Sequence, residues 1–247
     1  MQGPVQSELA IVVGAIDYGD ADRIVTFLTR GRGRLRGLAR SAKKSQKRFG
    51  GALEAGAKVE VRFRERTGAE LANLEGCDLL DARLGLRADY GRLAAALCAI
   101  EVARECAMER DVGTALFELL DEFLVHASGG GAFDAGVVCA FELRVLGVAG
   151  WRPALDRCVA CGRDVDERSH GGRVAFDAHG GGVLCAPCAS GRKGRTLSLG
   201  TVKTLRAVLA GERVSFSRVA REESEEALAA LLVAHLGKPL RARAFLE

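Results

Sequence analysis

The sequence predicts an α+β protein in which a small closed β-barrel is followed by an α-helical domain with an inserted four-cysteine element. Three observations lead to this prediction. Short apolar segments separated by glycine-containing turns fill residues 1–81, helical periodicity replaces them afterwards, and two Cys-x-x-Cys pairs lie in a glycine-rich stretch of the helical part. The chain has 247 residues, 48% of them hydrophobic, which is enough for a sizeable core.

Five segments of residues 1–81 have the composition of β-strands. Four are rich in β-branched and apolar residues: LAIVVGAID, IVTFLT, GRLRGLAR and KVEVRFRE. In the last of these, Val59, Val61 and Phe63 alternate with charged residues, as in a strand with one buried and one exposed face. A fifth strand through AELANLEGC alternates poorly. Five short strands in about eighty residues fit a five-stranded oligonucleotide-binding (OB) barrel, so residues 1–81 are predicted to form an OB-fold domain.

Residues 82–247 are predicted to form a helical domain. Amphipathic periodicity covers Tyr90 to Ile100 and Leu116 to Phe123, and SGGGA at 128–132 ends the second helix. A third helix through GVVCAFELRVLG stops near Gly147. Two later helices are predicted through SLGTVKTLRAVLAG and EESEEALAALLVAHLG, the latter with an acidic first turn that complements the helix dipole. These helices flank an insertion at about residues 152–192.

The insertion contains the most specific motifs of the chain, CVACG at 158–162 and CAPC at 185–188. The Cys-x-x-Cys spacing lets two thiolates bind one ion, and the 23 residues between Cys161 and Cys185 can form a ribbon between the pairs. Four cysteines complete a tetrahedral shell, so one structural zinc ion is predicted on Cys158, Cys161, Cys185 and Cys188. Alternatively, His170 or His179 replaces one cysteine, or the pairs serve redox exchange or arose by chance.

The remaining cysteines and histidines show no such pattern. Four cysteines in apolar helical segments or near a strand end are interpreted as small buried hydrophobic residues: Cys77, Cys98, Cys106 and Cys139. His126 and His235 lie near predicted helix ends, where the helix dipole favours them, and neither has a partner that indicates catalysis.

A run of basic residues follows the second predicted strand. Every charged residue from 23 to 53 is positive, whereas exposed surfaces ordinarily mix both signs. Arginines at alternate positions would point the same way about 6.7 Å apart on an extended strand, but a glycine-rich turn interrupts them. We therefore expect Arg30 and Arg32 on the turn and Arg34 and Arg36 at the start of the next strand. SAKKSQKRFGG is predicted to form a flexible basic loop that closes over a bound strand.

Phosphate groups are the natural counter-charge for this run, which makes it a candidate nucleic-acid surface. The alternative is a solvated surface loop whose charges only keep the protein soluble. Aromatic residues near the run are limited to Phe27, Phe49 and Phe63, so few stacking platforms are expected. Binding should be led by backbone electrostatics, tolerant of sequence and strongly salt-dependent. The candidate contact residues are Arg30, Arg32, Arg34, Arg36, Arg40, Lys43, Lys44, Lys47 and Arg48.

Signals of other protein classes are absent from the sequence. There is no secretory signal and no apolar run of about 18 residues, so a reducing cytoplasm is expected and membrane insertion is not. No G-x4-G-K-[ST], HExxH or GxSxG motif occurs, and the single GK pair precedes Pro239. The acidic cluster at 222–226 is interpreted as a helix N-terminus rather than a nuclease metal site. We therefore expect a binding protein and not an enzyme.

Three motifs in this order resemble the bacterial recombination and repair protein RecO family. They are YGDADRIVTFLTRGRGRLRGLARSAKKSQKRFGGALE, the junction FELRVLGVAGWRPALDRCVACG, and VAFDAHGGGVLCAPC. The resemblance runs from about Glu8 to the last helix. One departure concerns the basic loop, because the family usually has a glycine just ahead of it where this chain has Ser41, and a side chain restricts positive φ.

The resemblance implies an OB barrel, a helical domain and a zinc element that is a scaffold, since some family members lack the cysteines. It implies binding of single- and double-stranded DNA, annealing of complementary strands and, with RecR, help for RecA in replacing single-stranded-DNA-binding protein. It also implies a nucleoid-associated cytoplasmic location and DNA contacts on the basic residues named above. Two rivals stay open: a zinc-containing OB-fold RNA-binding factor and a metal-dependent nuclease.

Overall fold

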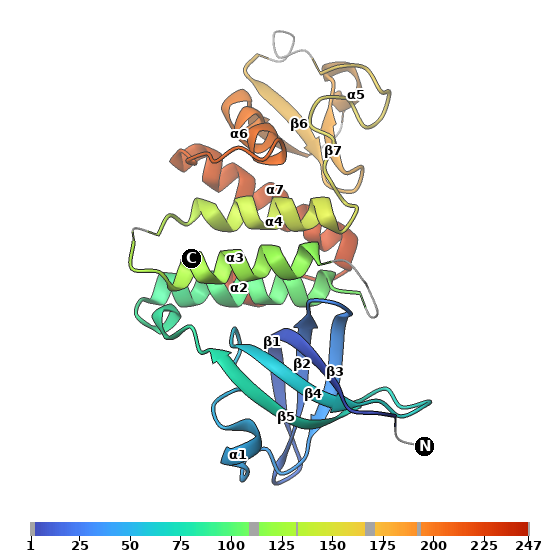
Figure 1. The fold of residues 1–247 in the computed structure, drawn as a ribbon. Coiled ribbons are helices and arrows are strands. Elements are labelled where there is room, and N and C mark those ends of the chain that lie inside the picture. Colours follow the sequence, from blue (N-terminus) through green and yellow to red (C-terminus); the bar gives the residue numbers. More distant parts are fainter. Residues whose placement is uncertain (1–2, 109–113, 132, 166–170, 192–193, 247) are drawn as a thin grey trace. The chain divides into compact units, whose positions relative to one another are not determined.

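The structure is a computed structural model that describes residues 3–108, 114–131, 133–165, 171–191 and 194–246 (Figure 1). The chain divides into two compact units, Met1–Phe133 with Ala242–Glu247, and Asp134–Arg241. The predicted domain boundary at residue 81 stays a prediction. It coincides with the end of the last barrel strand, and the compact unit that contains the barrel continues through two helices.

Five strands of the first unit form a closed barrel in the order β1-β2-β3-β5-β4. Neighbouring strands are antiparallel except for β3 and β5, which pair in parallel through Gly37 and Leu38. This barrel confirms the predicted OB fold. The strands are β1 Gln6–Tyr18, β2 Asp22–Thr29, β3 Gly33–Ala39, β4 Lys58–Arg64 and β5 Ala72–Asp81.

Alternating apolar residues of the strands fill the barrel. Val59, Val61 and Phe63 of β4 are fully buried, as their alternation predicts, and Phe27 of β2 packs in the same core. β5 alternates poorly because its pairing with β4 shifts register twice, between Lys58/Val59 and between Arg62/Phe63. The strand was therefore recognisable from its composition but not from its period.

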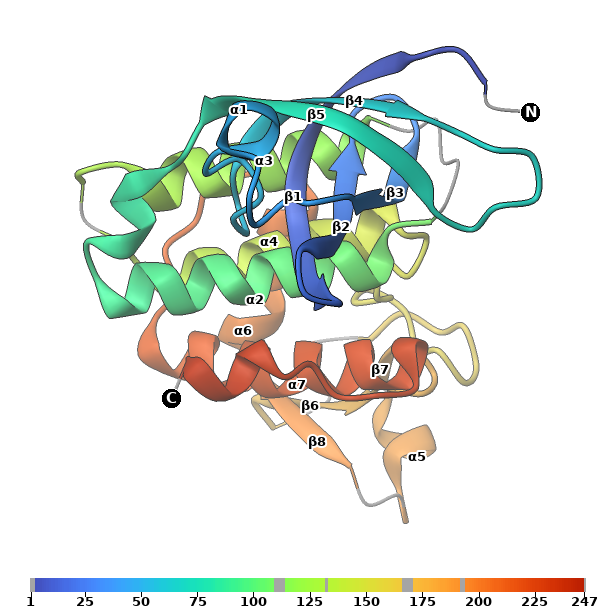
Figure 2. The same cartoon turned by 90° about the horizontal axis from the view of Figure 1, so that it is seen from below.

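Two helices, α2 Tyr90–Cys106 and α3 Ala115–Ser128, lie side by side and pack against β1 in the same unit (Figures 1 and 2). An ion-pair network joins α3 to the barrel: Asp121 of α3 pairs with Lys58 of β4 and with the buried guanidinium of Arg83, which follows β5. Short helical turns complete the unit: α1 Gln46–Phe49, η1 Leu84–Arg87 and η3 Ala242–Phe245.

The second unit combines three helices with a small antiparallel sheet in the order β7-β6-β8. Its elements are α4 Gly136–Val148, β6 Arg173–Asp177, β7 Gly182–Leu184, α5 Ala186–Ala189, β8 Arg195–Ser198, α6 Leu199–Leu209 and α7 Arg218–Leu236. The third strand, β8, was not predicted and runs directly into α6, so the sheet is joined to the helices without a linker. No helix in the described part of the chain is long and apolar enough to span a membrane.

The start of α7 corrects one prediction. The helix begins at Arg218 with Ser217 as its N-cap, whose side chain accepts a hydrogen bond from the amide of Ala220. Its first turn therefore contains no acidic residue, contrary to the prediction. The glutamates lie further along the helix, where Glu222 and Glu225 pair with arginines four residues earlier in the chain.

Candidate nucleic-acid interface and metal centre

The basic run occupies the β2–β3 turn, β3 and the loop that follows. Arg30 and Arg32 lie on the turn, and Arg34 and Arg36 lie at the start of β3, as predicted. The intervening Leu35 is buried in the barrel, so Arg34 and Arg36 point outward from the same face of β3.

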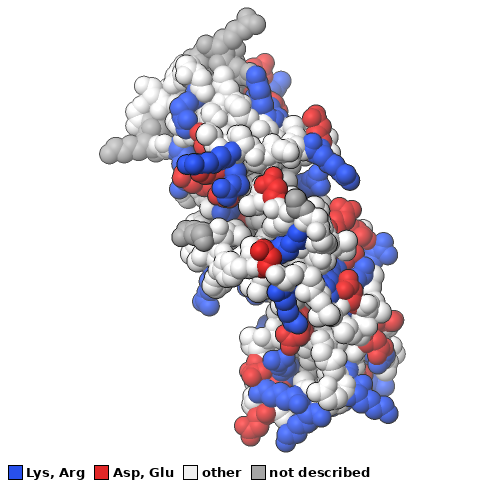
Figure 3. Space-filling model, turned by 90° about the vertical axis from the view of Figure 1, so that its left-hand side faces the viewer, with Lys and Arg blue, Asp and Glu red and all other residues white. Residues whose placement is uncertain are grey.

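Acidic residues far away in the sequence neutralise part of this run. Arg30 pairs with Glu118 of α3 at 2.7 Å, and Arg32 pairs with Glu65 at 3.1 Å. Lys43 pairs with Asp17 at 3.0 Å. The expectation of a run without balancing acids is therefore wrong for Arg30, Arg32 and Lys43, because chain folding brings acidic residues to them. Figure 3 shows blue and red side chains interspersed over the barrel.

Four of the candidate residues are exposed and form no ion pair with any described residue: Arg36, Arg40, Lys44 and Lys47. Arg34 and Arg48 are half-buried. The guanidinium of Arg48 donates to Ser45 Oγ and to the carbonyl oxygen of Arg40, and it lies 5.1 Å from the centroid of Phe49. The net positive charge available to a polyanion thus concentrates on β3 and the loop, not on the turn.

The loop after β3 is anchored to the β1–β2 turn. Ser41 adopts a left-handed conformation with a φ of 54°, so its position has the geometry for which a glycine is expected. Its amide donates to the carboxylate of Asp22 at 2.7 Å, and the amide of Lys43 donates to the carbonyl of Ala21. These bonds hold the basic side chains beside the turn of the β1–β2 hairpin.

A cleft of about 690 Å³ lies between β3 and the β4–β5 loop. Arg34 and Arg36 line one side, and Arg66 of the loop lines the other together with Glu65 and Glu70. Arg66 was not predicted from the sequence, because an isolated arginine in a turn gives no signal until barrel closure brings that turn beside β3. A smaller hollow of about 240 Å³ on the other side of the same arginines is lined by Thr26, Arg34, Arg36, Arg104 and Glu105.

The three phenylalanines considered as stacking platforms do not reach the surface. Phe27 and Phe63 are fully buried in the barrel, and Phe49 is nearly so. None of them can therefore stack on a base.

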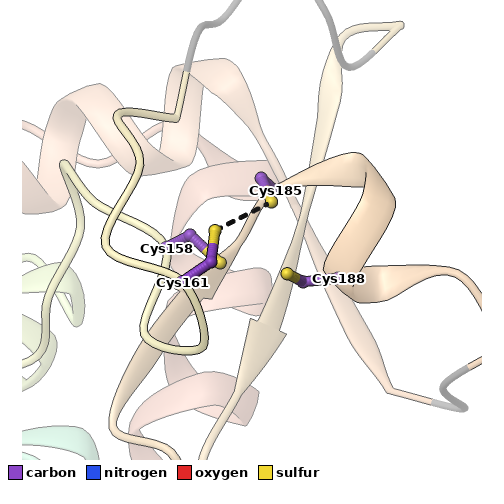
Figure 4. A group of neighbouring side chains, drawn as sticks. All are labelled: Cys158, Cys161, Cys185 and Cys188. Atoms are coloured by element: carbon purple, nitrogen blue, oxygen red, sulfur yellow. Dashed lines mark hydrogen bonds between the residues drawn. The ribbon is translucent and has the colours of Figure 1, made fainter.

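The four cysteines of the insertion converge as predicted (Figure 4). Cys158 and Cys161 come from the loop before β6, and Cys185 and Cys188 come from the end of β7 and from α5. Their Sγ atoms lie within 4.8 Å of one another, and those of Cys161 and Cys185 are 3.6 Å apart. Sulfurs about 2.3 Å from a tetrahedral zinc ion lie about 3.8 Å from each other, so the arrangement fits a four-thiolate metal site.

Comparison with known proteins places both units in one family. A family described as Recombination protein O N terminal matches residues 1–83, and one described as Recombination protein O C terminal matches residues 87–244. The chain is 42% identical over 250 residues to DNA repair protein RecO of Anaeromyxobacter sp. (strain K), covering 96% of this chain and 94% of the relative. It is 37% identical over 247 residues to DNA repair protein RecO of Geobacter sulfurreducens, covering 99% and 98%. The chain belongs to the RecO family.

The four clustered thiols of this RecO-family chain have unequal proton affinities. Burial acts to raise the pKa of Cys158, but hydrogen bonds from backbone N–H groups, led by that of Cys185, outweigh it and lower the pKa to about 6. Arg163 donates to Cys161 Sγ and lowers the pKa of that thiol. Hydrogen bonds with Cys185 and Cys161 raise the pKa of Cys188 to about 12. Two of the four residues thus favour the thiolate, the form that binds metal.

Two histidines could replace a cysteine as a metal ligand according to the sequence. His179 is not part of the cysteine group, and His170 lies outside the described residues. His126 and His235 lie in the last turns of α3 and α7, as predicted. The prediction of burial is confirmed for Cys77, Cys98, Cys106 and Cys139.

Proposed function

We propose that this chain is a DNA repair and recombination mediator that binds single- and double-stranded DNA without sequence preference and anneals complementary strands. With RecR it would help load RecA onto DNA coated by single-stranded-DNA-binding protein, in the nucleoid of the cytoplasm. Membership of the RecO family supports the repair role. The proposal assigns the chain no catalytic step.

One observation carries the DNA-binding part of the proposal. Arg36 on β3, Arg40 and Lys44 in the following loop, and Lys47 in α1 are exposed without an ion pair among the described residues. Arg36 also lines a cleft together with Arg34 and Arg66, and Glu65 and Glu70 offset part of the positive charge there. Phosphates are the ligands that such unpaired cations favour, and contacts to phosphates carry no sequence information.

Annealing follows from the same arrangement. Two strands repel each other through their phosphates, and a row of cations that binds the backbone screens this repulsion without selecting a sequence. The proposed contacts comprise all nine basic candidates, with unequal weights. Arg30, Arg32 and Lys43 must first exchange a carboxylate for a phosphate, so they should contribute less than the four unpaired cations.

The annealing test compares the native protein with a variant in which Arg36, Arg40, Lys44 and Lys47 are changed to Ala. Complementary fluorescent oligonucleotides should anneal with the native protein, and the rate should fall at least tenfold with the variant. The matched control removes four arginines that are already paired with carboxylates, the exposed Arg157, Arg195 and Arg218 and the half-buried Arg221. Equal loss in both variants would mean that total charge, and not this surface, drives annealing.

Two further experiments distinguish the proposed function from RNA binding and from nuclease activity. Matched RNA and DNA single strands should bind the same surface, and clear preference for RNA would favour the RNA-binding alternative. Labelled DNA incubated with magnesium or manganese should stay intact, whereas cleavage that survives purification would indicate a nuclease.

We propose that the four cysteines hold one zinc ion. Bound zinc would act as a structural cross-link between the loop before β6 and the end of β7, because four protein ligands leave no open coordination position. Purified protein should contain about one zinc per chain, and Cys158→Ser with Cys185→Ser should abolish it. Proteolysis should then cut the β6–β7 region faster, while a full metal load in this variant would contradict the assignment.

A further inference from the structure

The outward face of the β1–β2–β3 hairpin sheet contains an exposed apolar surface next to the basic residues. The pairing of the three strands shows which residues lie on this face. Thr26 pairs with Arg36, Ile24 pairs with both Ile16 and Leu38, and Asp22 pairs with Tyr18. Because every second residue of a strand points to the same side, the partners of Thr26 and Ile24 share the outward face of Arg36.

This surface is exposed although its residues are apolar. Ile16 is 61% exposed and Tyr18 is 56% exposed, while Ile24 and Leu38 are half-buried beside them. The Tyr18 hydroxyl has no hydrogen-bond partner among the described residues. Large apolar side chains gathered on one face of a sheet, rather than scattered, indicate a contact surface. We call Ile16, Tyr18, Ile24 and Leu38 the hairpin platform.

Cations border the hairpin platform at both ends. Arg36 lies one cross-strand row before Ile24 and Leu38. At the other end, the amide of Ser41 binds Asp22, the residue opposite Tyr18, and this bond keeps the loop with Arg40 and Lys44 nearby. Of the acids at this end, Asp17 pairs with Arg23 and Lys43 and Asp22 accepts the amide of Ser41, whereas Asp20 in the turn forms no ion pair with any described residue. The platform is therefore an apolar surface flanked by unpaired positive charge.

We propose that the hairpin platform binds the bases of single-stranded nucleic acid, with Tyr18 stacking on one base while Arg36 and Arg40 hold neighbouring phosphates. This inference rests on the proposed DNA-binding function and assigns it a base-contacting surface. An apolar protein partner would not use the flanking cations, whereas a single strand presents aromatic faces and phosphates in alternation, which matches the charge pattern. A duplex hides its base faces, so the platform serves single strands only.

Tyr18→Ala tests the proposal, with Tyr18→Phe as the conservative variant that keeps the ring. Tyr18→Ala should weaken binding to a single-stranded oligonucleotide by about 5- to 150-fold, the range for loss of one stacking aromatic residue. Binding to duplex of equal length should change less than about twofold, because stacked bases do not reach Tyr18. The matched control is Tyr90→Ala, the chain's other tyrosine, which is 65% exposed at the start of α2.

An abasic oligonucleotide of the same length separates base contacts from phosphate contacts. The native protein should bind it more weakly than the normal strand, and this difference should shrink in Tyr18→Ala. Equal loss of single-strand and duplex binding, no loss, or loss in Tyr90→Ala as well would overturn the platform while leaving DNA binding intact. Failure of the native protein to bind any DNA would instead overturn the proposed function and the platform with it.

Discussion

Ser41 and Gly37 show how single backbone positions set the geometry of the basic face. Ser41 has a φ of 54°, a conformation that is costly for a residue with a side chain, and the bond from its amide to Asp22 helps to hold it. Gly37 lies where β3 meets β5, and a Cβ atom there would be 2.3 Å from Leu74 Cδ2. The strand that carries Arg36 therefore closes the barrel only with glycine at position 37.

Gly37→Ala should lower the free energy of unfolding by about 1–3 kcal/mol, the usual cost of overpacking a core. Leu74 cannot move aside cheaply because it is buried in the barrel. Chemical denaturation measures the change. Gly147→Ala is the control, since no atom lies within 4 Å of a Cβ there, and alanine in a helix should be neutral or stabilising. If Gly37→Ala is as stable as the native protein, the β3–β5 contact that closes the barrel tolerates a side chain at position 37.

At the scale of elements, local patterns were predictable and pairings across the chain were not. The period of KVEVRFRE and the two Cys-x-x-Cys pairs are local, so the sequence predicted β4 and the cysteine cluster. The ion pair between Arg30 and Glu118 joins residues 88 positions apart, which only the packing of α3 beside the barrel creates. The hairpin platform depends likewise on the register of three strands.

The contact between α3 and the barrel depends on Asp121. Its carboxylate neutralises Arg83, whose side chain is fully buried and whose pKa is lowered by that burial. Asp121→Asn leaves this guanidinium without its main counter-charge and should cost about 3–5 kcal/mol in the free energy of unfolding. Replacing Arg83 by Met in the same variant should recover much of the loss. Asp81→Asn, an exposed and more distant carboxylate, should cost under about 1 kcal/mol.

Glu223 joins α7 to the small sheet of the second unit. Its carboxylate accepts from the Ser198 amide at 2.7 Å, from Thr201 Oγ1 and from Arg173. Burial acts to raise the pKa of Glu223, but these hydrogen bonds outweigh it and hold the pKa below its ordinary 4.5. A lowered pKa means that the group stabilises the fold above pH 4.5 and loses this effect as the pH falls through its folded-state pKa.

Glu223→Gln should therefore lower the melting temperature at pH 7. The difference in melting temperature between the variant and the native protein should become smaller below about pH 4.5. Comparing the difference in melting temperature, rather than the absolute temperature, removes the pH effects that both proteins share. Glu226→Gln is the control, because that carboxylate is exposed and pairs with Arg195 at the surface. A difference that is constant with pH would contradict the role of the Glu223 charge.

At the scale of the whole molecule, folding and not sequence order decides where positive charge stays without a neighbouring acid. The net formal charge is only +4, and acids from β1, the β4–β5 loop and α3 neutralise three of the nine basic candidates. What remains is a small set of cations without an ion pair to any described residue, on β3, its following loop and α1, of which Arg36 lines the cleft. The central claim is that this set binds the phosphates of DNA.

The salt dependence of single-strand binding tests that claim most directly. Each phosphate contact contributes about −0.7 to the slope of log K against log salt concentration for single strands. Removing Arg36, Arg40, Lys44 and Lys47 together should make the slope shallower by up to about 3, and the paired-arginine control should keep the native slope. An identical slope in the native protein and the fourfold variant would show that these cations do not contact DNA.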